Sequence, residues 1–154
     1  MKLKPGDKAP YFEARNQDNH LIKLSDFAGK KLVLYFYPKD NTPTCTVEAC
    51  NLRDNYEKFK KQGYAILGVS TDSGKSHKKF KDKLGLPFDL LEDTERKLVE
   101  QYEVWGEKFT FGKHYMGLRR TTFVINGDGV ITDIIEDVKS KNHAEQILGE
   151  GQDI

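Results

Sequence analysis

The chain has 154 residues, of which 37% are hydrophobic and 32% are charged, so it is long enough for one packed core and we expect a single domain over residues 1–154. Its formal net charge of +1 argues against nucleic acid or a membrane surface as a partner, and we expect neither a secretory signal nor a membrane-spanning segment. Two cysteines are too few for a disulfide scaffold, which favours a reducing, cytoplasmic setting.

The N-terminal residues predict a small hairpin followed by one helical turn. Residues 11–16 and 21–24 have the composition of two short strands around a polar turn. Ser25 can cap a single helical turn over residues 25–29.

The next segment predicts a buried strand, a helix and a second buried strand. Residues 32–37 form the most apolar run of the sequence, as in a strand that is covered on both faces. Thr42 and Pro43 are the N-cap and the first position of a helix that we expect to end near residue 62. Residues 64–70 form the second apolar strand, and a right-handed crossover makes the two strands parallel neighbours.

A lysine-rich helix is predicted over residues 73–84. Five lysines surround a stripe of three side chains, His77, Phe80 and Leu84. The lysines could form a basic patch for nucleic acid or an anionic partner. The near-neutral total charge instead favours a solvated helix face over a core stripe.

The second half adds further strands and helices. We expect a strand over 88–91, a helix over 93–102, and an antiparallel pair of strands over 121–125 and 130–135 around the turn at 126–129. Asn142 and Glu145 resemble a capping box for a last helix, which ends at Gly149.

Residues 103–118 are the least regular segment and are rich in aromatic side chains. Such a segment could cover an active site or dock a partner, but we expect a satellite cluster folded onto its own sheet, with a wall of the pocket as a secondary role. The residues concerned are Trp105, Phe109, Phe111, His114, Tyr115 and Met116.

The order of these elements predicts the fold class. It is an α/β protein with a thioredoxin-like fold, in which helices flank a mixed central sheet and the N-terminal β-hairpin is an extension. Functional sites in such sheets gather at the carboxyl ends of parallel strands, where strands lead into helix N-termini. Cys45 lies at such a place.

Cys45 is in the first turn of the helix that begins after Thr42. The N–H groups of a first turn have no partner within the helix and favour a negative charge beside them. A free thiol has a pKa of about 8.5, and helix N-termini favour its thiolate. A buried cysteine can also be a small hydrophobic residue. The turn chemistry before Cys45 favours the reactive thiolate.

Cys50 follows Cys45 on the same predicted helix. Cys45 faces inward, because it begins a stripe with helical spacing that includes Ala49, Leu52, Tyr56 and Phe59. Helix geometry places the Cα atoms of the two cysteines roughly 8–9 Å apart, whereas a disulfide needs less than about 7 Å. Either the cysteines never pair, or the first turns of the helix unwind when they do.

These residues carry a family resemblance that extends over essentially the whole chain. The segment Pro38-x-x-x-Thr42-x-x-Cys45 is similar to the active-site signature of the peroxiredoxins. The spacing of Cys45 and Cys50 resembles the branch of bacterioferritin comigratory protein and plant peroxiredoxin Q, an atypical two-cysteine type. Other matching segments are Leu52-Arg53-Asp54, Gly68-Val69-Ser70-Thr71-Asp72, Val104-Trp105-Gly106-Glu107-Lys108 and Arg120-Thr121-Thr122-Phe123.

The resemblance implies roles for the residues around the sulfur. Cys45 would attack a hydroperoxide and become a sulfenic acid. Thr42 would hold the peroxide in line with the sulfur, and Arg120 would stabilise the thiolate and the leaving oxygen. Pro38 would shield the sulfur from water, and Glu48 would orient the arginine.

The resemblance also implies a catalytic cycle. Cys50 would be the resolving cysteine, which forms an intramolecular disulfide with Cys45 that thioredoxin or a similar dithiol reduces. Hydrogen peroxide and organic hydroperoxides would be the substrates, no cofactor or metal would be needed, and the protein would be a monomer.

Two positions bear on this assignment. Thr44 stands where this branch is expected to have glycine, which could narrow access to the sulfur or restrict local unwinding. Arg119 adjoins Arg120, and strand alternation sends the two side chains to opposite faces, so only one can face Cys45. The register to Thr122 selects Arg120.

Other functional classes have less support. A thiol–disulfide oxidoreductase would show Cys-x-x-Cys, which the sequence lacks. The histidines are scattered and follow no metal-ligand spacing with the cysteines, so we expect them to be surface or partly buried packing residues; they are His20, His77, His114 and His143. A non-enzymatic peroxide sensor would use the same two cysteines and stays an alternative.

Overall fold

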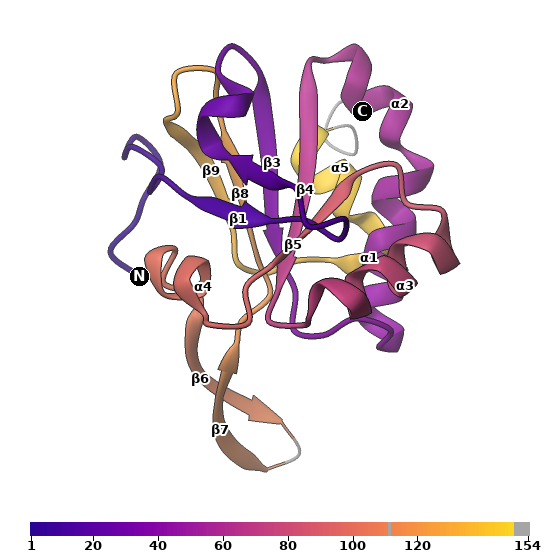
Figure 1. Cartoon of the computed structure of the whole chain (residues 1–154). Coiled ribbons are helices and arrows are strands. Elements are labelled where there is room, and N and C mark those ends of the chain that lie inside the picture. Colours follow the sequence, from indigo (N-terminus) through magenta and orange to yellow (C-terminus); the bar gives the residue numbers. More distant parts are fainter. Residues whose placement is uncertain (111, 150–154) are drawn as a thin grey trace.

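The computed structural model of the protein describes residues 1–110 and 112–149. Its centre is a five-stranded mixed sheet (Figure 1). The strands lie in the order β5 (Asp89–Glu92), β4 (Tyr64–Ser70), β3 (Lys31–Phe36), β8 (Thr121–Ile125) and β9 (Ile131–Ile135). β3, β4 and β5 are parallel, and β8 and β9 continue the sheet in antiparallel pairing. The mixed sheet expected from the sequence is confirmed.

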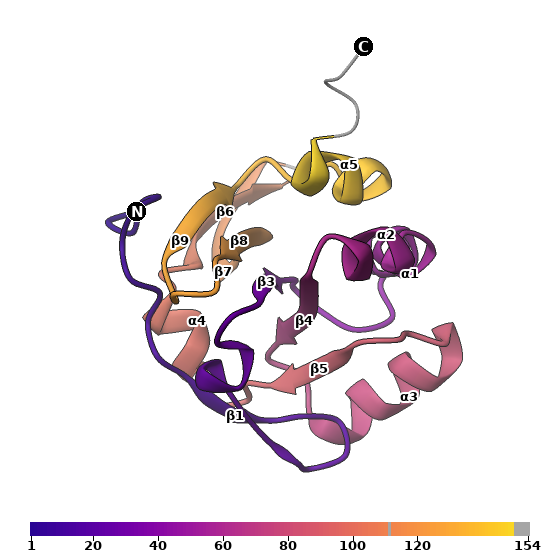
Figure 2. The same ribbon diagram turned by 90° about the horizontal axis from the view of Figure 1, so that it is seen from above.

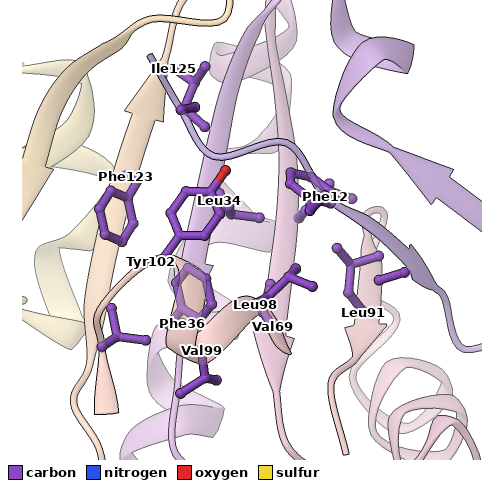
Figure 3. Packing of buried hydrophobic residues seen from close by; sticks show 14 of the residues in the cluster. Phe12, Leu34, Phe36, Val69, Leu91, Leu98, Val99, Tyr102, Phe123 and Ile125 are labelled. Carbon is purple, nitrogen blue, oxygen red and sulfur yellow. The ribbon is translucent and has the colours of Figure 1, made fainter. Parts of the chain in front are cut away.

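Side chains alternate along the central strand, so the sheet separates two hydrophobic cores. Leu32, Leu34 and Phe36 pack on one side, together with α4 (Lys97–Gln101) and the N-terminal segment (Figure 3). Val33 and Tyr35 pack on the other side. Figure 2 shows the helices of that second side, which are α1 (Pro43–Asp54), α2 (Tyr56–Lys61), α3 (Gly74–Leu84) and α5 (His143–Leu148). Cys45 belongs to this second core.

The N-terminal hairpin is present but shorter than expected. β1 (Glu13–Arg15) pairs antiparallel with β2 (Leu21–Lys23), and the turn η1 (Leu24–Phe27) follows directly. The expectation that Ser25 caps this turn is wrong. The Asp26 carboxylate accepts a hydrogen bond from the N–H of Lys23 at 2.9 Å, so the turn starts two residues earlier.

The helix expected over residues 43–62 is interrupted at Asn55, which is a correction to the sequence expectation. Asn55 has φ −106° and ψ 10°, and its side-chain amide donates to the carbonyl oxygen of Asn51 at 2.8 Å. A short amide side chain can compete in this way for the backbone acceptors that continue a helix. The inward stripe is nevertheless present, because Cys45, Ala49, Leu52 and Phe59 are all buried.

Two further helix starts differ from the sequence expectation. α4 begins at Lys97 rather than near residue 93, because the Asp93 carboxylate accepts from the N–H groups of Leu98 and Val99. Asp93 therefore caps the helix from outside it.

The last helix, α5, follows the short turn η2 (Ser140–Asn142) and ends at Gly149 as expected. Its start is not held by a capping box of Asn142 and Glu145. The side chain of Asn51 on α1 takes that place, since it accepts from the N–H of Ala144 and donates to the carbonyl oxygen of Lys141, both at 2.8 Å. A tertiary contact thus holds the start of α5.

Residues 105–110 and 113–118 form a regular hairpin that projects from the body of the domain (Figure 1). β6 (Trp105–Thr110) pairs antiparallel with β7 (Lys113–Leu118), so the expectation of an irregular segment is wrong. The expected satellite cluster is present only in part: the rings of Phe109 and His114 pack with centroids 4.7 Å apart on the hairpin, but Phe109 and Met116 are 63% and 59% exposed. Trp105 at the start of β6 and Leu118 at the end of β7 pack in the main core, and Phe111 lies outside the described residues.

The lysine helix has the arrangement that the sequence favours. His77 and Phe80 are buried in α3, and the lysines of this helix lie on its other faces. No helix within residues 1–110 and 112–149 is long and apolar enough to cross a membrane.

Candidate active site

The loop between β3 and α1 is held against the end of β4. The N–H of Tyr37 donates to the carbonyl oxygen of Val69 at 3.0 Å, and the N–H of Asp40 donates to Asp72 Oδ2 at 2.8 Å. Asn41 has φ +61°, in the left-handed region that asparagine tolerates better than most residues. Pro38 is half-buried at the start of this loop. The chain therefore enters α1 in a fixed direction.

A buried hydrogen-bond network ties the same loop to α3. Asp40 accepts from the Tyr37 hydroxyl at 2.6 Å and from the Ser76 hydroxyl at 2.8 Å. His77 Nδ1 also lies 2.8 Å from Asp40 Oδ2. Asp40, Asp72 and His77 have side-chain atoms within 4.8 Å of one another, which is close enough for metal ligands. The Asp40 oxygens already accept hydrogen bonds from the two hydroxyl groups. These hydrogen bonds account for the cluster as a structural support of the loop.

Cys45 is the third residue of α1, and its side chain is only 2% exposed. Thr42 is the N-cap, and its carbonyl oxygen accepts from the N–H of Thr46 at 2.9 Å. The Thr42 hydroxyl donates backward to the carbonyl oxygen of Lys39 at 3.0 Å. The Thr42 hydroxyl therefore does not cap α1. The first-turn N–H groups of Thr44 and Cys45 have no partner within the helix and can donate to another acceptor.

Arg120 joins Cys45 to Glu48. Its Nη2 donates to Cys45 Sγ at 3.2 Å, and its Nη1 donates to Glu48 Oε1 at 2.5 Å. The Arg120 side chain is 17% exposed and that of Glu48 is completely buried. Burial alone would lower the pKa of Arg120, but Glu48 and Cys45 outweigh it, so the pKa of the guanidinium is raised and the group keeps its charge.

The neighbouring arginine points away from the sulfur, as expected, although both arginines lie in the connection between β7 and β8 rather than in a strand. Arg119 is exposed, and its Nη2 donates to the carbonyl oxygen of Glu103 at 3.2 Å. Of the two arginines, Arg120 is the one that reaches the sulfur.

Behind Glu48 lies a buried histidine that sequence reasoning missed. Thr122 Oγ1 lies 2.7 Å from His143 Nε2, and His143 Nδ1 lies 3.2 Å from Glu48 Oε2. Burial raises the pKa of Glu48 to about 7, against the opposing charge of Arg120. Burial and then Arg120 lower the pKa of His143 to about 3.

The expectation that the histidines are surface or partly buried residues is therefore wrong for His77 and His143, although the core stripe of the lysine helix predicts the burial of His77. His77 and His143 are both fully buried and hydrogen-bonded. The helical stripe indicates the burial of His77. The burial of His143 has no comparable local signal, because Asn51 of α1 holds the start of α5 from a distant part of the chain.

Cys50 lies farther along α1 and is half-buried, and both thiols are free. The intact helix separates the two cysteines beyond the reach of a disulfide. Neighbours of Cys50 fasten this part of α1 to other elements. Asn51 is bonded to the start of α5, and Arg53 Nη1 donates to the carbonyl oxygen of Leu84 at 2.7 Å. Of the expected site residues, Cys45, Glu48 and Arg120 are thus in direct contact, Thr42 and Pro38 lie on the approach to α1, and Cys50 is apart.

Comparison with protein-family models matches residues 5–134 to the AhpC/TSA family. The chain belongs to this family. It is 48% identical over 148 residues to the peroxiredoxin Bcp of Bacillus subtilis, which covers 96% of this chain and 94% of that relative. It is 45% identical over 146 residues to the peroxiredoxin Bcp of Escherichia coli, covering 95% and 94% of the two chains. These relatives are Bcp peroxiredoxins, as the resemblance implied.

Solved structures agree with this membership. The bacterioferritin comigratory protein of Xanthomonas campestris, studied for its alkyl peroxide reduction activity, superposes with a TM-score of 0.84 at 36% identity, over 90% of this chain and 88% of that one. A PrxQ mutant of Xylella fastidiosa gives a TM-score of 0.90 at 32% identity, over 99% and 97% of the two chains. The thioredoxin-like fold is confirmed, and the protein is a peroxidase of the peroxiredoxin type.

Proposed function

We propose that the protein reduces hydrogen peroxide and organic hydroperoxides with Cys45 as the nucleophile. The observation that carries this proposal is the contact of Arg120 with both the Cys45 sulfur and the buried Glu48 carboxylate. A guanidinium in this position favours the thiolate, which is the nucleophilic form of cysteine. The alkyl peroxide reduction described for the Xanthomonas relative supports organic hydroperoxides as substrates.

In the first step the thiolate attacks one oxygen of the hydroperoxide. The S–O bond forms as the O–O bond breaks, so the sulfur is oxidised to a sulfenic acid and the peroxide is reduced to water or an alcohol after it takes up a proton. Donors aimed at the leaving oxygen stabilise the charge that develops there. Arg120 and the free first-turn N–H groups of α1 supply such donors.

Thr42 is suited to hold the substrate. Its hydroxyl hydrogen is engaged by the carbonyl oxygen of Lys39, so its lone pairs can accept from the O–H of a hydroperoxide. Pro38 begins the same loop and is placed to limit the access of water. Thr44 precedes the nucleophile at the helix start, and its N–H is among the donors that remain free.

In the second step Cys50 attacks the sulfenic acid, and a disulfide and one water molecule are formed. The first turns of α1 must unwind for this step, because the two residues are too far apart in the helix. An external dithiol such as thioredoxin then reduces the disulfide by thiol–disulfide exchange. We further propose that the protein works as a cytoplasmic monomer, which agrees with its free thiols and with a site built from one chain.

Two serine variants test the proposal. Cys45→Ser is expected to abolish peroxide consumption. Cys50→Ser is expected to retain the first oxidation and turnover with a small thiol such as dithiothreitol, but to lose turnover with thioredoxin and thioredoxin reductase. Hydrogen peroxide and an alkyl hydroperoxide serve as substrates in both assays. Near wild-type activity of Cys45→Ser would refute the nucleophile. A wild-type protein that is oxidised only once, without turnover, would indicate a sensor instead.

A further inference from the structure

Behind the contact between Arg120 and Cys45, the structure contains a buried chain of three polar side chains. It starts at the Thr122 hydroxyl on β8, passes through the imidazole of His143 at the start of α5, and ends at the Glu48 carboxylate on α1. All three residues are completely buried. A buried polar group is costly unless it has a hydrogen-bond partner, so the protons of this chain can be assigned from the donors and acceptors present.

The decisive pair of atoms is Glu48 Oε2 and His143 Nδ1, which lie 3.2 Å apart. In the described part of the chain neither atom has a hydrogen-bond partner, so the two face each other at 3.2 Å without the geometry of a hydrogen bond. A carboxylate can only accept, and a neutral imidazole has one donor and one acceptor nitrogen. Since burial lowers the pKa of His143 to about 3, its ring is neutral. Both atoms gain a partner when Nδ1 carries the proton and a small rotation of either side chain lets it donate to Glu48, while Nε2 accepts from the Thr122 hydroxyl.

We propose that His143 is a positioning residue for the reaction at Cys45, acting through Glu48 and Arg120. The imidazole lies against one carboxylate oxygen of Glu48, and the other carboxylate oxygen accepts from the guanidinium of Arg120, which also donates to the sulfur. This assignment rests on the proposed function, because it concerns the same sulfur. His143 is not part of the family signature around Cys45.

The imidazole also controls the charge of Glu48. Burial raises the pKa of this carboxyl to about 7, so at neutral pH its ionisation depends on the groups that face it. These are the charge of Arg120 and the neutral imidazole of His143, while the uncharged ring of Tyr35 packs edge-on against the imidazole, with ring centroids 5.8 Å apart. A donor at Nδ1 favours the carboxylate. Without it, Glu48 gains a proton more readily and Arg120 loses its ionic partner.

Asparagine and glutamine separate the two hydrogen bonds of His143. His143→Asn can keep an N–H donor near the Nδ1 position, facing Glu48. His143→Gln places its amide near the Nε2 position, so it can keep the contact with Thr122 but loses the donor to Glu48. His20→Gln changes an exposed histidine in the turn between β1 and β2 and serves as the matched control. Thermal unfolding of each variant checks that its fold is retained.

The first readout is the ionisation of Glu48, followed through the infrared band of a protonated buried carboxyl, with Glu48→Gln as the reference spectrum. In His143→Gln this band is expected to persist to a pH about one unit higher than in the wild type, as the loss of one hydrogen bond to a charged group predicts. His143→Asn is expected to lie closer to the wild type, and His20→Gln to coincide with it. This readout requires no peroxidase activity.

The second readout is the pH dependence of the first oxidation by hydrogen peroxide, measured in a Cys50→Ser background. The acid limb of the rate is expected to move upward with the carboxyl band, by about one pH unit in His143→Gln. Alkylation of Cys45 in the same buffers separates the ionisation of the thiol from that of Glu48. An unmoved band and rate profile in a folded His143→Gln would overturn the inference, as would equal shifts in His143→Asn and His143→Gln. Activity in Cys45→Ser would instead overturn the proposed function.

Discussion

Arg120→Lys tests whether the forked shape of the guanidinium matters in addition to its charge. Arg120 reaches Glu48 with one nitrogen at 2.5 Å and the Cys45 sulfur with the other at 3.2 Å. A lysine ammonium keeps the charge but is a single point and cannot span both partners. It is expected to stay with the buried carboxylate, so the sulfur loses its donor. A hydrogen bond to a charged group contributes about 1.5–3 kcal/mol, and the rate constant of the first oxidation should therefore fall roughly 10- to 100-fold.

The assay is a single turnover of the reduced protein with hydrogen peroxide, in which the loss of free thiol is followed in rapid-quench samples. Arg119→Lys is the matched control, because the same substitution then affects an exposed neighbour that points away from the site. Its rate constant is expected to stay within about twofold of the wild type, as is usual for a surface change. A rate constant of Arg120→Lys equal to that of Arg119→Lys would refute the reasoning.

Two further predictions concern the pH dependence of stability and the motion of α1. The pKa of Glu48 is about 7 in the fold against an ordinary 4.5, so the folded protein holds a proton that the unfolded chain has lost. Its contribution to stability is fully present below pH 4.5 and is lost as the pH rises to about 7. In urea unfolding, the free energy of unfolding of the wild type minus that of Glu48→Gln is therefore expected to fall between pH 4.5 and about 7. A difference that does not change with pH would contradict the raised pKa of Glu48. Oxidation to the disulfide is expected to expose the amides of residues 44–50 to hydrogen exchange while β3 stays protected. Equal protection in both redox states would show that no unwinding occurs.

The sequence allowed the core of the site to be predicted because its signals are local. Thr42 and Pro43 set the start of α1, and the helical stripe turns Cys45 inward. Alternation along the chain correctly separated Arg120 from Arg119. Each of these features depends on residues within a few positions of one another, where propensity and periodicity are informative.

Some of the errors occurred where a single side-chain contact, near or far along the chain, decides where a helix begins or ends. The burial of His143 depends on Asn51, which anchors the start of α5 to α1. The start of α4 depends on a carboxylate, Asp93, that caps N–H groups five and six residues ahead. Local composition does not contain such contacts.

The hairpin of β6 and β7 was missed for a different reason. Its aromatic content suggested a packed cluster, whereas Phe109 and Met116 are exposed on a ladder held by backbone pairing. Aromatic residues favour strands whether or not both faces are covered, so their number alone does not indicate burial.

The ionisation of Cys45 in the reduced protein is the most direct test of the account. The ultraviolet absorbance of the thiolate, titrated in Cys50→Ser so that one sulfur reports, gives this ionisation without any substrate. The contact with Arg120 and the free N–H groups at the start of α1 predict a thiolate at neutral pH, and a signal that is lost in Cys45→Ser. A sulfur that is still protonated at neutral pH would contradict it.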